Sequence, residues 1–155
     1  MYQIDFKKPI HVHFIGIGGI SMSGLAEILM REGFRISGSD AHESELTDHL
    51  EAAGAKVMYG QAAANITDDI DLVVYTAAVH ADNPEYAEVV RRGIPMMTRA
   101  ELLGQIMKNY GEAIAVSGTH GKTTTTSMIT DILLEAEKNP TVTVGGILKD
   151  IGGNI

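Results

Sequence analysis

Strand-like and helix-like segments alternate along this chain, and that alternation restricts the possible folds more than any other feature of the sequence. Short runs rich in β-branched residues are followed by glycine-containing turns and then by apolar residues at helical spacing. The expected strands cover residues 11–15, 34–37, 56–59, 71–76, 113–117 and 141–144. This order predicts an α/β fold with a parallel, doubly wound sheet.

Capping residues mark the helix boundaries. Asn83-Pro84 offers an N-cap followed by proline at the first helical position, and the helix it begins should end at Gly93. The sequence Thr98-Arg99-Ala100-Glu101 is a capping box ahead of another helix. Further helices are expected at about residues 20–33 and 43–53, and from the turn after residue 118 to about residue 137.

The length of 155 residues suits one good-sized domain plus part of a second. The helix that follows Thr98 frays by residues 108–111, and a new strand is expected from Ala113. We therefore predict a domain boundary near residue 111, with one α/β domain over residues 1–110 and the start of a second over residues 111–155.

The balance of charges limits the possible partners. The 20 acidic and 12 basic residues give a net charge of −8, so non-specific binding to nucleic acid or to an anionic membrane is not expected. Cysteine is absent, which excludes disulfides and thiolate metal sites. No targeting segment and no run of about 20 apolar residues is visible. The composition predicts a cytoplasmic protein.

The segment from Gly118 to Thr124 predicts a site for a nucleoside triphosphate. It lies between an expected strand and an expected helix, where backbone N–H groups can bind phosphate. Lys122 would reach the β- and γ-phosphates, and the Thr123 hydroxyl would coordinate Mg²⁺. The strict pattern has glycine at position 116, where this chain has Val116. The expected ATP-binding residues are Gly118, Thr119, His120, Gly121, Lys122, Thr123 and Thr124.

A second glycine-rich turn, at residues 16–21, follows the first expected strand and opens a helix. That is the position of a dinucleotide fingerprint, although the third fingerprint residue is Ser21 rather than glycine. Asp40 ends the second expected strand, near where an acid would contact a ribose hydroxyl. The turn fits NAD, another nucleotide diphosphate, or no ligand at all. Beside a triphosphate loop, it suggests an enzyme that activates a nucleotide-linked substrate with ATP.

Several motifs, in order along the chain, resemble the Mur ligase family. They occupy residues 13–19, 22–27, 37–40, 83–85, 99–103 and 117–126, with Gly145-Gly146 after them. The resemblance is strongest to the branch that joins L-alanine to UDP-N-acetylmuramate, and the loop at residues 118–124 is its most specific part. A sister branch that recycles intact peptides shares much of the same pattern.

The resemblance implies a three-domain enzyme of peptidoglycan precursor synthesis. Residues 1–110 would be its Rossmann-like UDP-sugar-binding domain, and residues 111–155 the incomplete beginning of its P-loop-type α/β ATPase domain. ATP would phosphorylate the muramic acid carboxylate to an acyl phosphate, and the amine of L-alanine would attack it. Gly16, Gly18 and Gly19 would lie against the UDP diphosphate, with Ser39 and Asp40 in the same substrate site. Lys122 would act in catalysis with Mg²⁺, stabilising charge on the transferred phosphoryl group. The L-alanine site would lie outside this chain.

The same resemblance predicts that this chain, as the amino-terminal portion of a longer ligase, is inactive alone. Residues 113–155 should then present apolar surface and could self-associate. Two alternatives remain open: an NAD(P)-dependent oxidoreductase built on Gly16 and Asp40, and a UDP-sugar-binding module without turnover. His11 and His13 are expected at a partly exposed strand end rather than in a metal site.

Overall fold

The structure is a computed structural model that describes residues 2–144. The chain divides into two compact units, residues 1–111 and 112–155, and each is described by itself. Gly145-Gly146 and the end of the last expected segment lie outside the described residues. Within residues 2–144, no helix is both long and apolar enough to cross a membrane.

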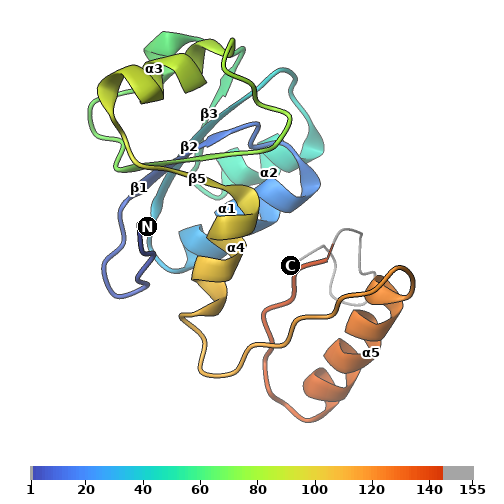
Figure 1. Cartoon of the computed structure of the whole chain (residues 1–155). Coiled ribbons are helices and arrows are strands. Elements are labelled where there is room, and N and C mark those ends of the chain that lie inside the picture. The colour runs from blue at the N-terminus through green and yellow to red at the C-terminus, as the bar shows by residue number, and fades with distance from the viewer. Residues whose placement is uncertain (1, 145–155) are drawn as a thin grey trace. The chain divides into compact units, whose positions relative to one another are not determined.

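The first unit is built on a five-stranded parallel sheet (Figure 1). Its strands are β1 (His11–Ile15), β2 (Arg35–Asp40), β3 (Lys56–Tyr59), β4 (Leu72–Tyr75) and β5 (Met96–Thr98), in the order β3-β2-β1-β4-β5. The chain moves outward from β1 to β3 and then crosses back to β4, so the order reverses between β1 and β4. The carboxyl ends of strands at such a switch point are where open α/β sheets bind ligands.

Helices cover both faces of this sheet, as the alternating pattern predicts. They are α1 (Ile20–Arg31), α2 (Glu45–Ala52), the short 3₁₀ turn η1 (Ala63–Asn65), α3 (Pro84–Arg92) and α4 (Arg99–Met107). The Asn83 side chain accepts hydrogen bonds from the backbone of Glu85 and Tyr86, and Gly93 ends α3 at φ 66°. Thr98 and Glu101 form the expected capping box. These predicted boundaries are confirmed.

The two faces of the sheet differ in chemistry. α1, α2 and α4 lie over one face, which carries the fully buried Val12 and Phe14, and α3 lies over the other (Figure 1). On the α3 side, an apolar cluster joins β1 and β4 to the helix; it contains Ile15, Ile66, Ile70, Val73 and Val89. The β1 and β2 positions on this same face include His13, Ser37 and Ser39, all buried. Their polar groups therefore need internal partners.

The second unit contains a single described helix, α5 (Lys122–Glu135), after an exposed loop. The predictions of strands at residues 113–117 and 141–144 are wrong for the structure, because both segments lack regular structure. A strand requires a hydrogen-bonded neighbour, and none of the described residues of this unit supplies one. α5 ends at Glu135, two residues before the expected end.

Apolar side chains in the second unit are exposed. Ile114, Met128, Ile132 and Leu134 have exposures between 42% and 68%. Exposed apolar surface was expected for residues 113–155, and its described part shows it. Self-association stays a prediction.

Candidate functional site

The first candidate site is the glycine-rich turn between β1 and α1, and the end of β2 holds its shape. The backbone oxygen of Ser39 accepts hydrogen bonds from the amides of Gly16 and Ile17, at 2.8 and 2.9 Å. The Asp40 Oδ2 atom accepts a third, from the amide of Gly18 at 2.8 Å. Two successive residues of β2 thus satisfy three successive amides of the turn.

Glycine is required in this turn because the chain packs so closely on β2. A Cβ atom on Gly18 would lie 2.8 Å from Asp40 Oδ2 and 3.1 Å from a methyl group of Thr47. Gly16 has φ +86°, a conformation that other residues rarely adopt. The sequence predicted glycine for close approach of a ligand; the structure shows close approach of the protein's own second strand.

The amides of Gly16, Ile17 and Gly18 are therefore already engaged within the protein. An anion at this turn would instead meet the start of α1, where Gly19 is the N-cap and Ser21 and Met22 belong to the first turn. Amides in the first turn of a helix have no acceptor within that helix, and the dipole favours an anion there.

Asp40 has a contact that the sequence did not predict. Its Oδ2 atom accepts from Gly18, and its Oδ1 atom accepts from the amide of Ala41 at 2.8 Å. The Asp40 carboxylate therefore holds the turn in place from the end of β2.

A buried polar network lies beside the turn on the α3 side of the sheet. Glu85 is fully buried, and its Oε2 atom accepts a hydrogen bond from Ser39 Oγ at 2.6 Å, while Asn65 donates to Oε1. His13 Nε2 lies 3.6 Å from Glu85 Oε2, at ion-pair distance. Burial alone would raise the pKa of Glu85, but His13 and the hydrogen bonds from Ser39 and Asn65 outweigh it and lower that pKa.

The network continues along β1 to the other end of the strand. The Ser37 hydroxyl lies 2.9 Å from His13 Nδ1 and 2.8 Å from His11 Nε2, and His11 Nδ1 contacts Asp69. The expectation that both histidines occupy a partly exposed strand end is wrong: His11 is 7% exposed and His13 is not exposed. The covering segments, α3 and the connection before β4, could not be placed over β1 from sequence alone.

Burial also acts on the titration of His11. Desolvation, reinforced by the nearby Arg35 guanidinium, lowers the pKa of His11 below its ordinary value, although Asp69 opposes the shift. His11 is therefore held neutral to lower pH in the folded protein than in the unfolded chain.

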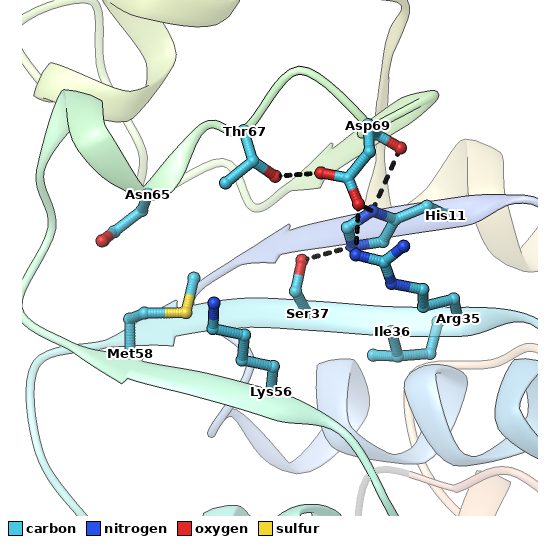
Figure 2. A pocket seen from close by; sticks show the side chains of 9 residues that line it. All are labelled: His11, Arg35, Ile36, Ser37, Lys56, Met58, Asn65, Thr67 and Asp69. Atoms are coloured by element: carbon cyan, nitrogen blue, oxygen red, sulfur yellow. Dashed lines mark hydrogen bonds and ion pairs between the residues drawn. The ribbon is translucent and has the colours of Figure 1, made fainter.

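A cavity of about 260 Å³ opens at the opposite end of the strands from the glycine-rich turn (Figure 2). It includes the first residues of β1, β2 and β3, and its lining consists of His11, Arg35, Ile36, Ser37, Lys56, Met58, Asn65, Thr67 and Asp69. Figure 2 shows Arg35 and His11 directed at the Asp69 carboxylate, which pairs with both. None of the residues predicted to bind a ligand lines this cavity.

The second candidate site is the loop at residues 118–124 in the second unit. Gly121 has φ +78° and is the N-cap of α5, and Lys122 is the first residue of the helix. The Lys122 ammonium donates to the backbone oxygen of Gly118 at 2.6 Å, so its side chain lies back over the loop. The loop is exposed, including His120, Thr123 and Thr124. The structure thus places an exposed lysine and threonine at the amino end of a helix.

Comparison with known proteins identifies the family. The sequence model described as "Mur ligase family, catalytic domain" matches residues 11–111. The chain belongs to the Mur ligase family. Its resemblance to that family, inferred from the motifs, is confirmed.

Curated Mur ligases match over the whole chain. The UDP-N-acetylmuramate–L-alanine ligase of Agathobacter rectalis is 70% identical over 155 residues, which is 100% of this chain and 34% of the relative. The ligase of the same name from Lachnospira eligens is 65% identical over 154 residues, or 99% of this chain and 34% of the relative. The chain therefore spans about a third of the length of these relatives.

Solved Mur ligases share the fold. The UDP-N-acetylmuramate-alanine ligase MurC from Thermotoga maritima matches with a TM-score of 0.85 and 37% identity, covering 94% of this chain and 34% of that one. The UDP-N-acetylmuramate:L-alanyl-gamma-D-glutamyl-meso-diaminopimelate ligase from Neisseria meningitides matches with a TM-score of 0.86 and 32% identity, covering 95% and 46%.

Proposed function

We propose that this chain carries the UDP-sugar-binding domain and the ATP phosphate loop of an ATP-dependent ligase. That ligase joins L-alanine to the carboxylate of UDP-N-acetylmuramate in peptidoglycan precursor synthesis. The observation that carries the proposal is the 70% identity, over every residue of the chain, to a ligase of that name. The sister activity, ligation of a whole peptide, is represented by a structure only 32% identical to this chain.

We assign UDP-N-acetylmuramate to the first domain, residues 1–110, at the carboxyl end of β1. The turn follows the strand at the switch point of the sheet, where α/β proteins bind nucleotides. The diphosphate would lie against Gly16, Gly18 and Gly19, with its negative charge at the first turn of α1. Ser39 and Asp40 belong to the site because they hold the turn in shape.

We assign ATP and Mg²⁺ to residues 111–155, which begin a second domain. Residues Gly118 to Thr124 would hold the phosphates, with the Thr123 hydroxyl on the metal ion. When bound, ATP supplies the phosphoryl group that turns a poorly reactive carboxylate into an acyl phosphate. Lys122 would neutralise charge that develops on the phosphoryl oxygens. Within residues 2–144, His, Asp and Glu side chains form no group of three that could hold a metal.

The remaining parts of the reaction are assigned to the two thirds of the relatives' length that this chain does not match. L-alanine would bind there, and turnover by this chain alone is not expected. The proposed location is the cytoplasm, where ATP and nucleotide-linked sugars are available. Neither nucleic acid nor membrane is among the proposed partners, whereas the exposed apolar residues of α5 favour self-association of this chain.

Titration calorimetry of the 155-residue chain tests the proposal. UDP-N-acetylmuramate should bind, UDP alone should bind more weakly, and Mg·ATP should bind weakly or not at all. NADH is the control for the oxidoreductase alternative. Binding of NADH without binding of UDP-N-acetylmuramate would overturn the proposal.

A further inference from the structure

Glu85 is a buried carboxylate whose role the proposed function leaves open. It has no exposure to solvent, and a buried charge costs several kcal/mol unless it is paired and hydrogen-bonded. It lies in the first turn of α3, beyond the Asn83 cap, where the helix dipole favours an anion. The surroundings of Glu85 therefore favour its charged form.

The partners of Glu85 come from three other segments of the first unit. Ser39 Oγ, at the end of β2, donates to Oε2 at 2.6 Å. Asn65, at the end of η1, donates to Oε1. His13 Nε2, on β1, lies 3.6 Å away and has no hydrogen-bond partner among the described residues. One carboxylate thus ties α3 to two strands and to η1.

Two routes lead from this carboxylate to the glycine-rich turn. In the first, the Ser39 residue held by Glu85 is the one whose backbone oxygen accepts from Gly16 and Ile17. In the second, Asn65 also donates to the Gly60 oxygen at 2.9 Å, and the Gly60 amide donates to the Asp40 oxygen at 2.8 Å. Both residues that shape the turn are therefore connected to Glu85.

We propose that Glu85 is a positioning residue for the nucleotide diphosphate. Through Ser39 it fixes the end of β2, and the end of β2 fixes the turn on which the diphosphate would rest. The ligand in this inference rests on the proposed function. The hydrogen bonds that connect Glu85 to the turn through Ser39 do not, so the ligand and the connection can be tested separately.

Three variants of the 155-residue chain test this role. Glu85→Gln keeps the shape but turns an amide toward donors, and Ser39→Ala removes the hydroxyl while keeping the backbone oxygen. Glu88→Gln is the matched control, because Glu88 lies one turn along α3 and pairs with Arg91 and Arg92 instead. Calorimetry should show affinity for UDP-N-acetylmuramate reduced about tenfold by Glu85→Gln and about threefold by Ser39→Ala. The control should stay within about twofold of wild type.

A positioning role also predicts how the effects combine. The double variant should bind no more weakly than Glu85→Gln alone, because Glu85 is proposed to act through Ser39. Affinities that multiply as independent effects would overturn the inference. If the Glu85→Gln chain does not fold, the Ser39→Ala variant tests the inference alone. Unchanged affinity for UDP-N-acetylmuramate and unchanged amide resonances of the turn in Ser39→Ala would overturn the inference.

Amide NMR spectra separate positioning from a purely structural role and need no ligand. The resonances of Gly16, Ile17 and Gly18 should move in Glu85→Gln and Ser39→Ala but not in Glu88→Gln. A folded Glu85→Gln chain with unchanged turn resonances and affinity, and only a lower unfolding midpoint, would refute the positioning role. If the wild-type chain does not bind UDP-N-acetylmuramate, the proposed ligand is wrong, and the turn resonances alone decide the inference.

Discussion

The two glycine-rich turns of this chain have similar sequences around them, but they differ in the strands and hydrogen bonds that hold them in place. The turn at residues 16–19 follows a formed strand, and β2 satisfies three of its amides. The loop at residues 118–121 follows a segment without regular structure, and the hydrogen bonds described for it come from α5: Lys122 donates to Gly118, and the Thr125 amide donates to Gly121. A glycine motif before a helix predicts where a loop lies, whereas neighbouring strands determine whether that loop is held.

Hydrogen exchange should show the largest difference between the two turns. The amides of Gly16, Ile17 and Gly18 have acceptors on a central strand, whereas residues 118–121 are exposed. Exchange in the first turn should be slower by about a thousandfold or more, because it needs opening of the sheet. Amide exchange followed by NMR or mass spectrometry measures this. Similar rates in the two turns would contradict the comparison.

Substitution of a turn glycine should have the next largest effect. Gly18→Ala would place a methyl group 2.8 Å from Asp40 Oδ2, and the overpacking should cost about 1–3 kcal/mol of unfolding free energy and weaken UDP-sugar binding. Gly104→Ala is the control, because that position lies within α4 with nothing within 4 Å. The control should stabilise the chain by about 0.5–1 kcal/mol. Urea unfolding measures both, and an equally stable Gly18→Ala chain would be incompatible with the close packing.

The first unit should also lose stability on mild acidification. The pKa of His11 is lowered in the folded state, so between pH 6.5 and that lower value the unfolded chain binds more protons than the folded one. Stability should therefore fall as pH decreases through 6.5 and level off below the folded pKa. Urea unfolding at pH 7.5, 6.5 and 5.5 measures the slope.

Two variants test whether His11 causes the dependence of unfolding free energy on pH. His11→Asn should flatten this dependence, whereas His42→Asn, at an exposed position, should leave it unchanged. An identical slope in wild type and His11→Asn would exclude His11 as the cause. The carboxylate of Glu85, whose pKa is lowered, adds stability above pH 4.5 that is lost only at lower pH.

The smallest expected effect tests the division of labour between the two turns. Lys122→Ala removes the cation of the exposed loop and should leave the affinity for UDP-N-acetylmuramate within about twofold of wild type. Calorimetry of the Lys122→Ala and Gly18→Ala chains with UDP-N-acetylmuramate compares the effects of the two substitutions on affinity directly. A large loss of UDP-sugar affinity in Lys122→Ala would show that the two sites are not independent.

Local signals in the sequence predicted local structure well. The Asn83-Pro84 start, the Gly93 stop and the Thr98 capping box all depend on residues within a few positions of each other, and the structure confirms them. The alternation of strand and helix likewise predicted the parallel sheet. Strands at residues 113–117 and 141–144 were predicted wrongly, because strand formation depends on a partner that local pattern does not reveal.

Contacts between residues far apart in the sequence were not predicted. Ser39 and Glu85 are 46 positions apart, and nothing in either segment indicates that a serine hydroxyl and a carboxylate meet under α3. Asp40 was predicted in the substrate site from its place at a strand end. Its hydrogen bond to Gly18 became visible only with the fold. The buried histidines of β1 escaped prediction for the same reason.

The two hydrogen bonds that the Ser39 carbonyl oxygen accepts have a consequence for the thermodynamics of binding. Because folding of the sheet already fixes the backbone of the Gly16 turn, a ligand arriving there has little conformational entropy to remove. Its binding free energy is then available for affinity and discrimination rather than for ordering the protein. A nucleotide at such a turn should bind with the small heat-capacity change of a rigid site rather than the large one of coupled folding.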